Sequence, residues 1–307
     1  MKRLASTLVV GIVALSACGD DTTETATTAP PVTAAATVPP AVEPTDAATP
    51  SGSSAAECAA GKTLAADGLT IATGDPAFPP YVIDNAPESG QGFEAAVALA
   101  VAGELGFEGD TVTWIRTGFD AAIAPGAKDF DFNLQQYSIN PERQETVTFS
   151  EPYYTSNQAV LGYVDGAAAG VTSLADLKSF KLGAAASTTS LTFITDVIQP
   201  DAEPFAYNSN ADAKAALDNK QIDAIVADLP TALYISGVEI EGTKVFGQFP
   251  VDVGGAGDTW GLLFAKDNPL VECANLAIAA LTASGDLAAI EAEWMAEYTE
   301  APTLAAG

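Results

Sequence analysis

A run of hydroxyl side chains at residues 187–190 follows the short apolar segment 181–185 and begins the next predicted helix. Hydroxyl residues at a strand-to-helix junction commonly cap the helix, because their oxygen accepts a hydrogen bond from a free backbone N–H group. The same free N–H groups attract carboxylates and other anions. The residues alone leave both roles open, a helix cap and an anion site.

Two further polar residues, Gln136 and Asp228, stand at the ends of predicted strands. Gln136 follows a predicted helix at 119–123, a turn and a predicted strand at 130–135, and the same order recurs at 212–227 before Asp228. This repetition predicts two similar lobes. Because ligands bind beyond the carboxyl ends of strands in such sheets, we expect both residues to face a shared cleft.

The elements that must position these residues alternate along the chain. A β-rich run at 69–73 is followed by an apolar segment with helical spacing at 93–105 and by another strand pattern at 111–115. Strands separated by helices indicate a parallel sheet, so the predicted fold class is α/β.

The residue inventory excludes several chemistries. The chain has no histidine and three cysteines, which rules out Ser/His/Asp and Cys/His triads, histidine-ligated zinc and multi-cysteine metal clusters. We therefore expect no metal and no cofactor. With 12 Lys and Arg against 40 Asp and Glu, the formal net charge is −28, and a surface this acidic repels nucleic acids. A phosphate loop around Lys62 is dismissed, because Ala56 stands where that motif needs glycine.

The N-terminal residues have the pattern of a secretory leader. Lys2 and Arg3 precede an apolar run at 4–15, and small residues stand just before Cys18. Residues 15–18 resemble the bacterial lipobox, and this resemblance implies that Cys18 becomes the lipidated first residue of the mature protein. An ordinary signal peptide followed by an incidental cysteine is the alternative.

A signal peptide at 1–17 would be followed by a spacer at 18–57, rich in Thr, Ala and Pro and without basic residues. We expect this spacer to be disordered, because it lacks the apolar side chains that offset ordering entropy. If Cys18 carries a lipid, Cys58 and Cys273 remain in an oxidising compartment, and we predict that they pair. Two free buried thiols are the alternative.

Several short motifs stand in a fixed order between residues 64 and 298. They are residues 92–94, 138–143, 147–153, 183–189, 221–228 and 260–269. The ordered set resembles the family 3 extracellular solute-binding proteins, the amino-acid receptors of ABC importers. The resemblance implies an α/β, two-lobe periplasmic-binding-protein-like fold of type II, in which each lobe is a sheet flanked by helices and two hinge crossovers join them. Lobe 1 would comprise 58–161 plus 259–307, and lobe 2 would comprise 162–258.

The resemblance also implies a clamp for an α-amino acid. Arg143 would bind the ligand carboxylate with help from Thr188 and Thr189, and Asp228 with Ser138 would hold the ammonium. A zwitterion that leaves water needs matched, hydrogen-bonded opposite charges. The arginine fork donates two parallel bonds to a carboxylate, and an ionised aspartate only accepts. Spacing alone favours a surface ion pair for Arg143 and a helix cap for Asp228.

The same resemblance places Asp75, Phe78, Phe119 and Gln135 in the pocket that selects the side chain. An acid and an amide beside aromatic rings favour a polar or cationic side chain. A turn role for Asp75 and a core role for the two phenylalanines remain open. Gln136 replaces a small hydroxyl residue common in the family, and we expect it to take up room in the pocket.

The implied function is the extracytoplasmic binding component of an ABC importer, which captures a polar amino acid and delivers it to a membrane permease. We expect a monomer without enzymatic activity, anchored to the outer face of the cell membrane through Cys18. One alternative is an exported dehydratase or lyase on the same fold, with Asp75 or Glu94 as acid or base. The other is a ligand-sensing co-receptor.

Overall fold

The computed structural model describes residues 53–249, 253 and 258–306. The predicted signal peptide, Cys18 and most of the predicted spacer lie outside these residues. Within the described ranges, no single helix has the length and apolar character needed to cross a membrane; α8 (Leu270–Ser284) and α9 (Asp286–Trp294) meet both criteria only as a pair bent by 78°.

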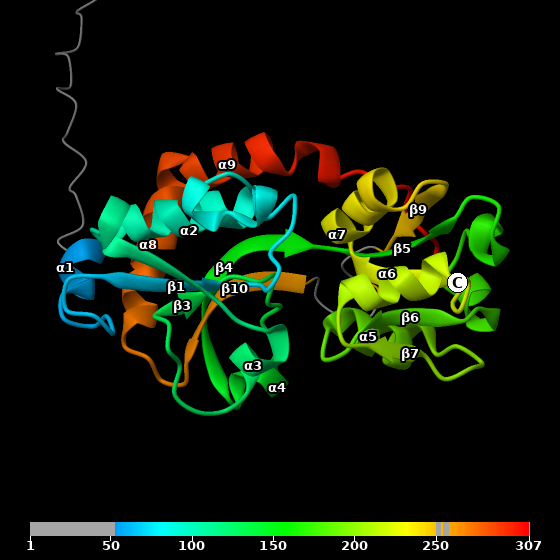
Figure 1. The fold of residues 1–307 in the computed structure, drawn as a ribbon, viewed down its shortest axis with the longest axis horizontal. Helices are drawn as coiled ribbons and strands as arrows, with labels where there is room; N and C mark the ends of the chain where they lie inside the picture. Colours follow the sequence, from blue (N-terminus) through cyan, green and yellow to red (C-terminus); the bar gives the residue numbers. More distant parts are fainter. Residues whose placement is uncertain (1–52, 250–252, 254–257, 307) are drawn as a thin grey trace, which may run out of the picture. The chain divides into compact units, whose positions relative to one another are not determined.

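The first lobe is built on a five-stranded sheet in the order β2-β1-β3-β10-β4 (Figure 1). Strand β1 pairs in parallel with β2 and β3, whereas β10 is antiparallel to β3 and β4. Helices α1, α2, α8 and α9 pack on one face, and α3 packs on the other. Because both faces are covered, β1 is buried almost throughout, with only Thr70 partly exposed. The bounds are α1 Ala55–Ala59, β1 Leu69–Thr73, α2 Phe93–Glu104, β2 Val112–Arg116, α3 Phe119–Ile123, β3 Phe132–Asn133, α4 Pro141–Gln144, β4 Val147–Ser156 and β10 Asp258–Ala265.

The second lobe repeats this arrangement with the strand order β7-β6-β8-β5-β9 (Figure 1). Strand β6 is parallel to β7 and β8, and β5 is antiparallel to β8 and β9. Helix α5 packs on one face of this sheet, and α6 and α7 pack on the other. The bounds are β5 Gln158–Tyr163, β6 Leu182–Ala185, α5 Thr189–Phe193, β7 Phe205–Tyr207, α6 Asn210–Asp218, β8 Ala224–Asp228, α7 Leu229–Tyr234 and β9 Thr243–Gln248. Shorter 3-10 and π-helical segments occupy Ile83–Asn85, Pro87–Ser89, Gly109–Thr111, Ala167–Gly170, Ala175–Ser179, Ile194–Ile198, Ile235–Glu239 and Ala296–Tyr298.

The predicted α/β class and the repeated order of elements are confirmed. The strand predicted at 130–135 is much shorter in the structure, where only β3 is formed. Gln136, just beyond it, has a φ of 50°, and its N–H donates to a Glu94 carboxylate oxygen instead of joining the sheet. The backbone therefore leaves the sheet early to meet a side chain from α2.

The chain crosses between the sheets after β4 and again after β9. The lobe limits differ from those predicted, because the boundary at 161 falls inside β5, which pairs in the second sheet from Gln158 onward. The C-terminal tail also reaches the second lobe, although 259–307 was assigned to the first. Thr303 bridges to Gln248, and Leu304 is buried in the second lobe's core, close to Gly247, where a side chain would leave no room for it.

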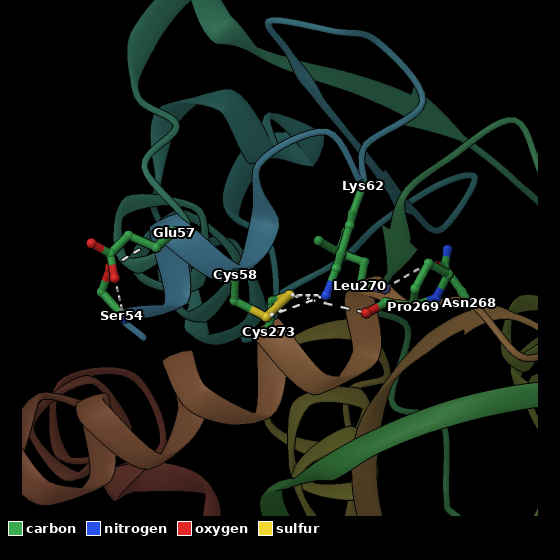
Figure 2. Close-up of a disulfide and its surroundings, with 8 residues drawn as sticks. All are labelled: Ser54, Glu57, Cys58, Lys62, Asn268, Pro269, Leu270 and Cys273. Atoms are coloured by element: carbon green, nitrogen blue, oxygen red, sulfur yellow. Dashed lines mark hydrogen bonds between the residues drawn. A yellow bond between two sulfur atoms is a disulfide. The ribbon is translucent and has the colours of Figure 1, made fainter. Parts of the chain in front are cut away.

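A disulfide between Cys58 and Cys273 links α1 to α8, with the two Cα atoms 5.4 Å apart (Figure 2). Lys62 points its ammonium at both sulfur atoms, at 3.5 and 3.4 Å. Helix α1 begins with a capping box, in which Ser54 and Glu57 exchange hydrogen bonds between side chain and backbone. The pairing of the two thiols in the exported protein stays a prediction, which thiol counting can check.

Candidate ligand-binding cleft

Arg143 lies on α4, whose first turn is capped by Asn140, and its side chain is only 6% exposed. One guanidinium nitrogen donates to the Ser138 carbonyl of its own lobe at 2.7 Å, and the other donates to the Ser187 carbonyl of the second lobe at 2.9 Å. The guanidinium carbon also stands 5.2 Å from the centre of the Phe119 ring. Burial lowers the pKa of Arg143 and the charge of Asp258 opposes this, but arginine stays charged in proteins. Arg143 is thus a buried interlobe contact and not a surface ion pair.

The hydroxyl run at 187–190 divides between the two roles that the sequence left open. Thr188 is the cap of α5, because its Oγ1 accepts from the Leu191 N–H at 3.2 Å. Thr189 turns its hydroxyl toward the other lobe, 3.3 Å from the Ser138 hydroxyl, and also accepts from the Gln158 amide at 3.4 Å. The structure therefore places Ser138 beside Arg143 and Thr189, the residues predicted for the ligand carboxylate, although Ser138 was predicted to bind the ammonium together with Asp228.

Next to this group is a cavity of about 480 Å³ between the lobes. Arg143 and residues of α3 and α4 line it from the first lobe, and the start of α5 lines it from the second. The lining residues are Asp120, Ile123, Ala124, Pro125, Asn140, Glu142, Arg143, Glu145, Thr146, Ser187, Thr188, Thr189, Leu191 and Thr192. The arginine and both threonines of the predicted clamp are therefore accessible from one interlobe space.

Asp228 ends β8 and caps α7, where its Oδ1 accepts from the Thr231 N–H at 3.0 Å. The same oxygen accepts from the hydroxyl of Tyr81, a first-lobe residue, at 2.6 Å. Burial raises the pKa of Asp228, these hydrogen bonds lower it, and the nearby charge of Asp258 raises it. Asp228 is thus both a helix cap and an acceptor at the contact between the lobes.

Of the two predicted aromatic selectivity residues, Phe78 contacts the second lobe and Phe119 packs within the first. Phe78 stacks on Tyr234 of the second lobe, with ring centres 6.4 Å apart and planes at 29°. Phe119 stacks on Tyr137 at 4.8 Å, beneath the Arg143 guanidinium. Both rings are partly buried in the described structure. Neither ring is among the residues that line the interlobe cavity, so their role in side-chain selection stays a prediction.

The polar selectivity residues are arranged differently from the expectation. Gln135 accepts from the Tyr137 hydroxyl at 2.8 Å. Gln136 was expected to take up room in the pocket, but its backbone and side-chain amides both donate to Glu94. Asp75 is exposed, and none of the described residues makes a hydrogen bond or ion pair with its side chain. The Gln136 side chain is therefore bound to Glu94, and the role of Asp75 in the pocket stays a prediction.

Glu94 is a buried acid at the base of this region, 2% exposed on α2. Its carboxylate accepts from the Gln136 backbone at 2.8 Å, from the Gln136 side chain and from the Tyr153 hydroxyl. Burial raises the pKa of Glu94 to about 7, against the opposing effect of these hydrogen bonds, and the charge of Asp228 raises it further. The carboxyl therefore titrates near neutral pH.

Three residues at contacts between the lobes were not anticipated from the sequence, although none of them lines the cavity itself: Tyr81, Gln158 and Asp258. Gln158 begins β5 and its amide donates to the Asp258 carboxylate at the start of β10. No local pattern marks these residues, because each acquires its partner only when the crossovers bring the lobes together. A strand boundary placed correctly at 158 would have been the one available signal for Gln158.

The chain is similar to known solute-binding proteins in sequence and fold. The family described as bacterial extracellular solute-binding proteins, family 3, matches residues 69–297. ABC transporter arginine-binding protein 1 of Escherichia coli K12 is 28% identical over 226 residues, which cover 71% of this chain and 86% of that protein. An ancestral arginine-binding protein solved with arginine is 28% identical, with a TM-score of 0.62 over 74% of this chain and 98% of its own. An ancestral amino acid-binding protein, a precursor of cyclohexadienyl dehydratase, is 26% identical, with a TM-score of 0.61 over 74% and 95% of the two chains.

Proposed function

The chain belongs to the bacterial extracellular solute-binding proteins of family 3, and on this premise we propose that it captures an α-amino acid between its lobes for an ABC importer. The observation that carries the proposal is the buried Arg143, whose guanidinium joins the two lobes beside the Thr189 hydroxyl. Asp228, on the second lobe, supplies the opposite charge at another contact between the lobes, where it accepts from Tyr81.

In this proposal the ligand carboxylate is bound by Arg143 and Thr189, and the ammonium is bound by Asp228. The Arg143 fork now donates to two backbone carbonyls, at Ser138 and Ser187, and a carboxylate is a stronger acceptor than either. Because the two ends of the ligand would engage residues of different lobes, binding would favour the closed arrangement. A ligand closes the lobes only as far as it binds the closed form better than the open one.

The relatives named as arginine-binding make cationic amino acids the first ligands to test. Delivery to a membrane permease follows from the family's role in ABC import. The leader pattern supports export, with Cys18 as the lipid-bearing residue that anchors the protein to the outer face of the membrane. In this proposal the folded part is a monomer.

We infer binding without catalysis, although a neighbouring structure is a precursor of a dehydratase. Glu94 has the raised pKa of an acid or base catalyst. However, its two carboxylate oxygens accept from Gln136 and Tyr153, and it is 2% exposed. A carboxyl occupied in this way supports a structural role more than proton transfer to a ligand.

The test is a thermal-shift screen of the purified full chain against the twenty amino acids, ornithine and citrulline, followed by calorimetry on the hits. A ligand present at 100 times its Kd stabilises the folded state by about 2.7 kcal/mol, a shift of roughly 5–10 °C for a domain of this size. We expect Arg143→Lys and Asp228→Asn each to weaken binding by about 30-fold or more while the ligand-free protein still unfolds cooperatively. Absence of a shift with every amino acid would overturn the proposal.

A further inference from the structure

Gln158 and Asp258 occupy equivalent places at the two crossovers, each as the first residue of the strand that follows. Gln158 is 8% exposed, and its amide nitrogen donates to the Asp258 carboxylate and, at 3.4 Å, to the Thr189 hydroxyl. The pair is therefore joined by hydrogen bonds to the hydroxyl that belongs to the proposed carboxylate site. Neither residue has a role in the clamp described above.

The amide oxygen of Gln158 is buried and has no hydrogen-bond partner in the described part of the chain. The orientation of the amide follows from its partner, since an ionised carboxylate only accepts and must face the NH₂ group. The oxygen is thus directed away from Asp258. A buried carbonyl oxygen without a donor is costly, so this atom, on a side chain bonded to the cavity-lining Thr189, is a candidate acceptor for a ligand.

The charge of Asp258 reaches both ends of the clamp. It is the strongest charge acting on Arg143, whose pKa it raises, and it also raises the pKa of Asp228. The cleft therefore holds two carboxylates, Asp228 and Asp258, for one guanidinium, and Glu94 adds a third acid when ionised. A zwitterionic ligand leaves this excess of negative charge unchanged, whereas a ligand with a second cationic group neutralises Asp258.

We propose that Asp258 and Gln158 form the subsite for a cationic ligand side chain, so that this protein selects amino acids such as arginine, lysine and ornithine over neutral ones. The inference rests on the proposed function and adds the residues that determine specificity. Asp258 would pair with the side-chain cation, and the Gln158 oxygen would accept a hydrogen bond from the same group. The exposed Asp75, which the family pattern favours, would not be the discriminating acid.

Selectivity follows from the charge pair that only a ligand with a cationic side chain can form with Asp258. Citrulline has nearly the shape of arginine but a neutral ureido group, so it would bring no charge to Asp258. A site whose buried polar groups lose their partner rejects such an analogue strongly. We expect the wild-type chain to bind arginine at least about 100-fold more tightly than citrulline.

The experiment measures the affinities of arginine and citrulline by calorimetry on the full chain and on four variants. Asp258→Asn keeps the size of the side chain and removes its charge, and Gln158→Met removes the amide. We expect each to weaken arginine binding by about 30-fold or more and to change citrulline binding by less than about threefold. Asp75→Asn should leave the ratio of the two affinities unaltered. Asp201→Asn, an exposed acid of the second lobe, is the matched control for a general loss of negative charge.

Four results would overturn the inference. If Asp258→Asn weakened arginine and citrulline binding equally, Asp258 would instead bind the ammonium or stabilise the fold. A melting curve of the variant distinguishes these two roles. Loss of selectivity in Asp75→Asn but not in Asp258→Asn would make Asp75 the discriminating acid. Wild-type protein that binds neutral amino acids and not cationic ones would refute the subsite and leave the proposed function intact. Binding of no amino acid at all would refute both.

Discussion

The buried Glu94 predicts that stability falls as pH rises toward neutrality. Its pKa is raised from 4.5 to about 7, with burial as the main cause. The folded protein therefore holds this proton more tightly than the unfolded chain does between these two values. The contribution of this proton to the unfolding free energy is fully present below pH 4.5 and is lost as pH rises through 7. A shift of this size corresponds to about 3 kcal/mol of unfolding free energy, at 1.36 kcal/mol per pKa unit.

The perturbation is Glu94→Gln, which cannot ionise. Its remaining oxygen can accept from Gln136 or Tyr153, but its NH₂ group must face a donor, so we expect a loss of about 1–3 kcal/mol at pH 4.5. Near pH 8 the wild type has lost most of the stabilisation that the protonated Glu94 carboxyl contributes at pH 4.5. The two proteins should therefore approach each other in stability as pH rises.

The assay is denaturant unfolding of the ligand-free full chain at half-unit steps from pH 4.5 to 8. With a net charge of −28, general repulsion also weakens the fold as carboxylates ionise, so the informative quantity is the difference between the two curves. Glu241→Gln, which removes an exposed acid, should run parallel to the wild type. Parallel curves for Glu94→Gln and the wild type would refute the reasoning, because they would mean that Glu94 does not change protonation in this range.

Two further predictions concern contacts that hold parts of the chain together. Tyr81→Phe keeps a ring against Trp260 but removes the hydroxyl that donates to Asp228 across the lobes, a bond to a charged group worth about 1.5–3 kcal/mol. We expect small-angle X-ray scattering of the ligand-free variant to show a larger radius of gyration, and an unchanged value would contradict this role. Replacing Cys58 and Cys273 together by serine should lower the unfolding free energy by up to about 5 kcal/mol, because the bridge spans 215 residues, and should leave ligand affinity unaltered. In a Cys18→Ser background, two reactive thiols in the unreduced protein would rule out the pairing.

The sequence by itself determined the class of the protein. Hydrophobic periodicity indicates alternating strands and helices, and these local patterns persist in the fold because each element buries its own apolar face. The absence of histidine excludes whole mechanisms without any structure. The order of the motifs predicted that Arg143 and Asp228 lie on different lobes. The local pattern placed the hydroxyl run 187–190 at the start of a helix, and in the structure Thr188 caps α5.

Only the tertiary structure decided what these residues contact. Tyr81 and Asp228 are 147 residues apart, and Gln158 and Asp258 are 100 apart, so no local spacing predicts either pair. The family pattern pointed to Asp75 as the acid of the pocket, but the described fold leaves it exposed and buries Glu94 instead. Burial and pairing across the crossovers depend on how the two sheets meet. The strength of a charge depends on that burial, which is why the electrostatics of the cleft could be derived only from the folded chain.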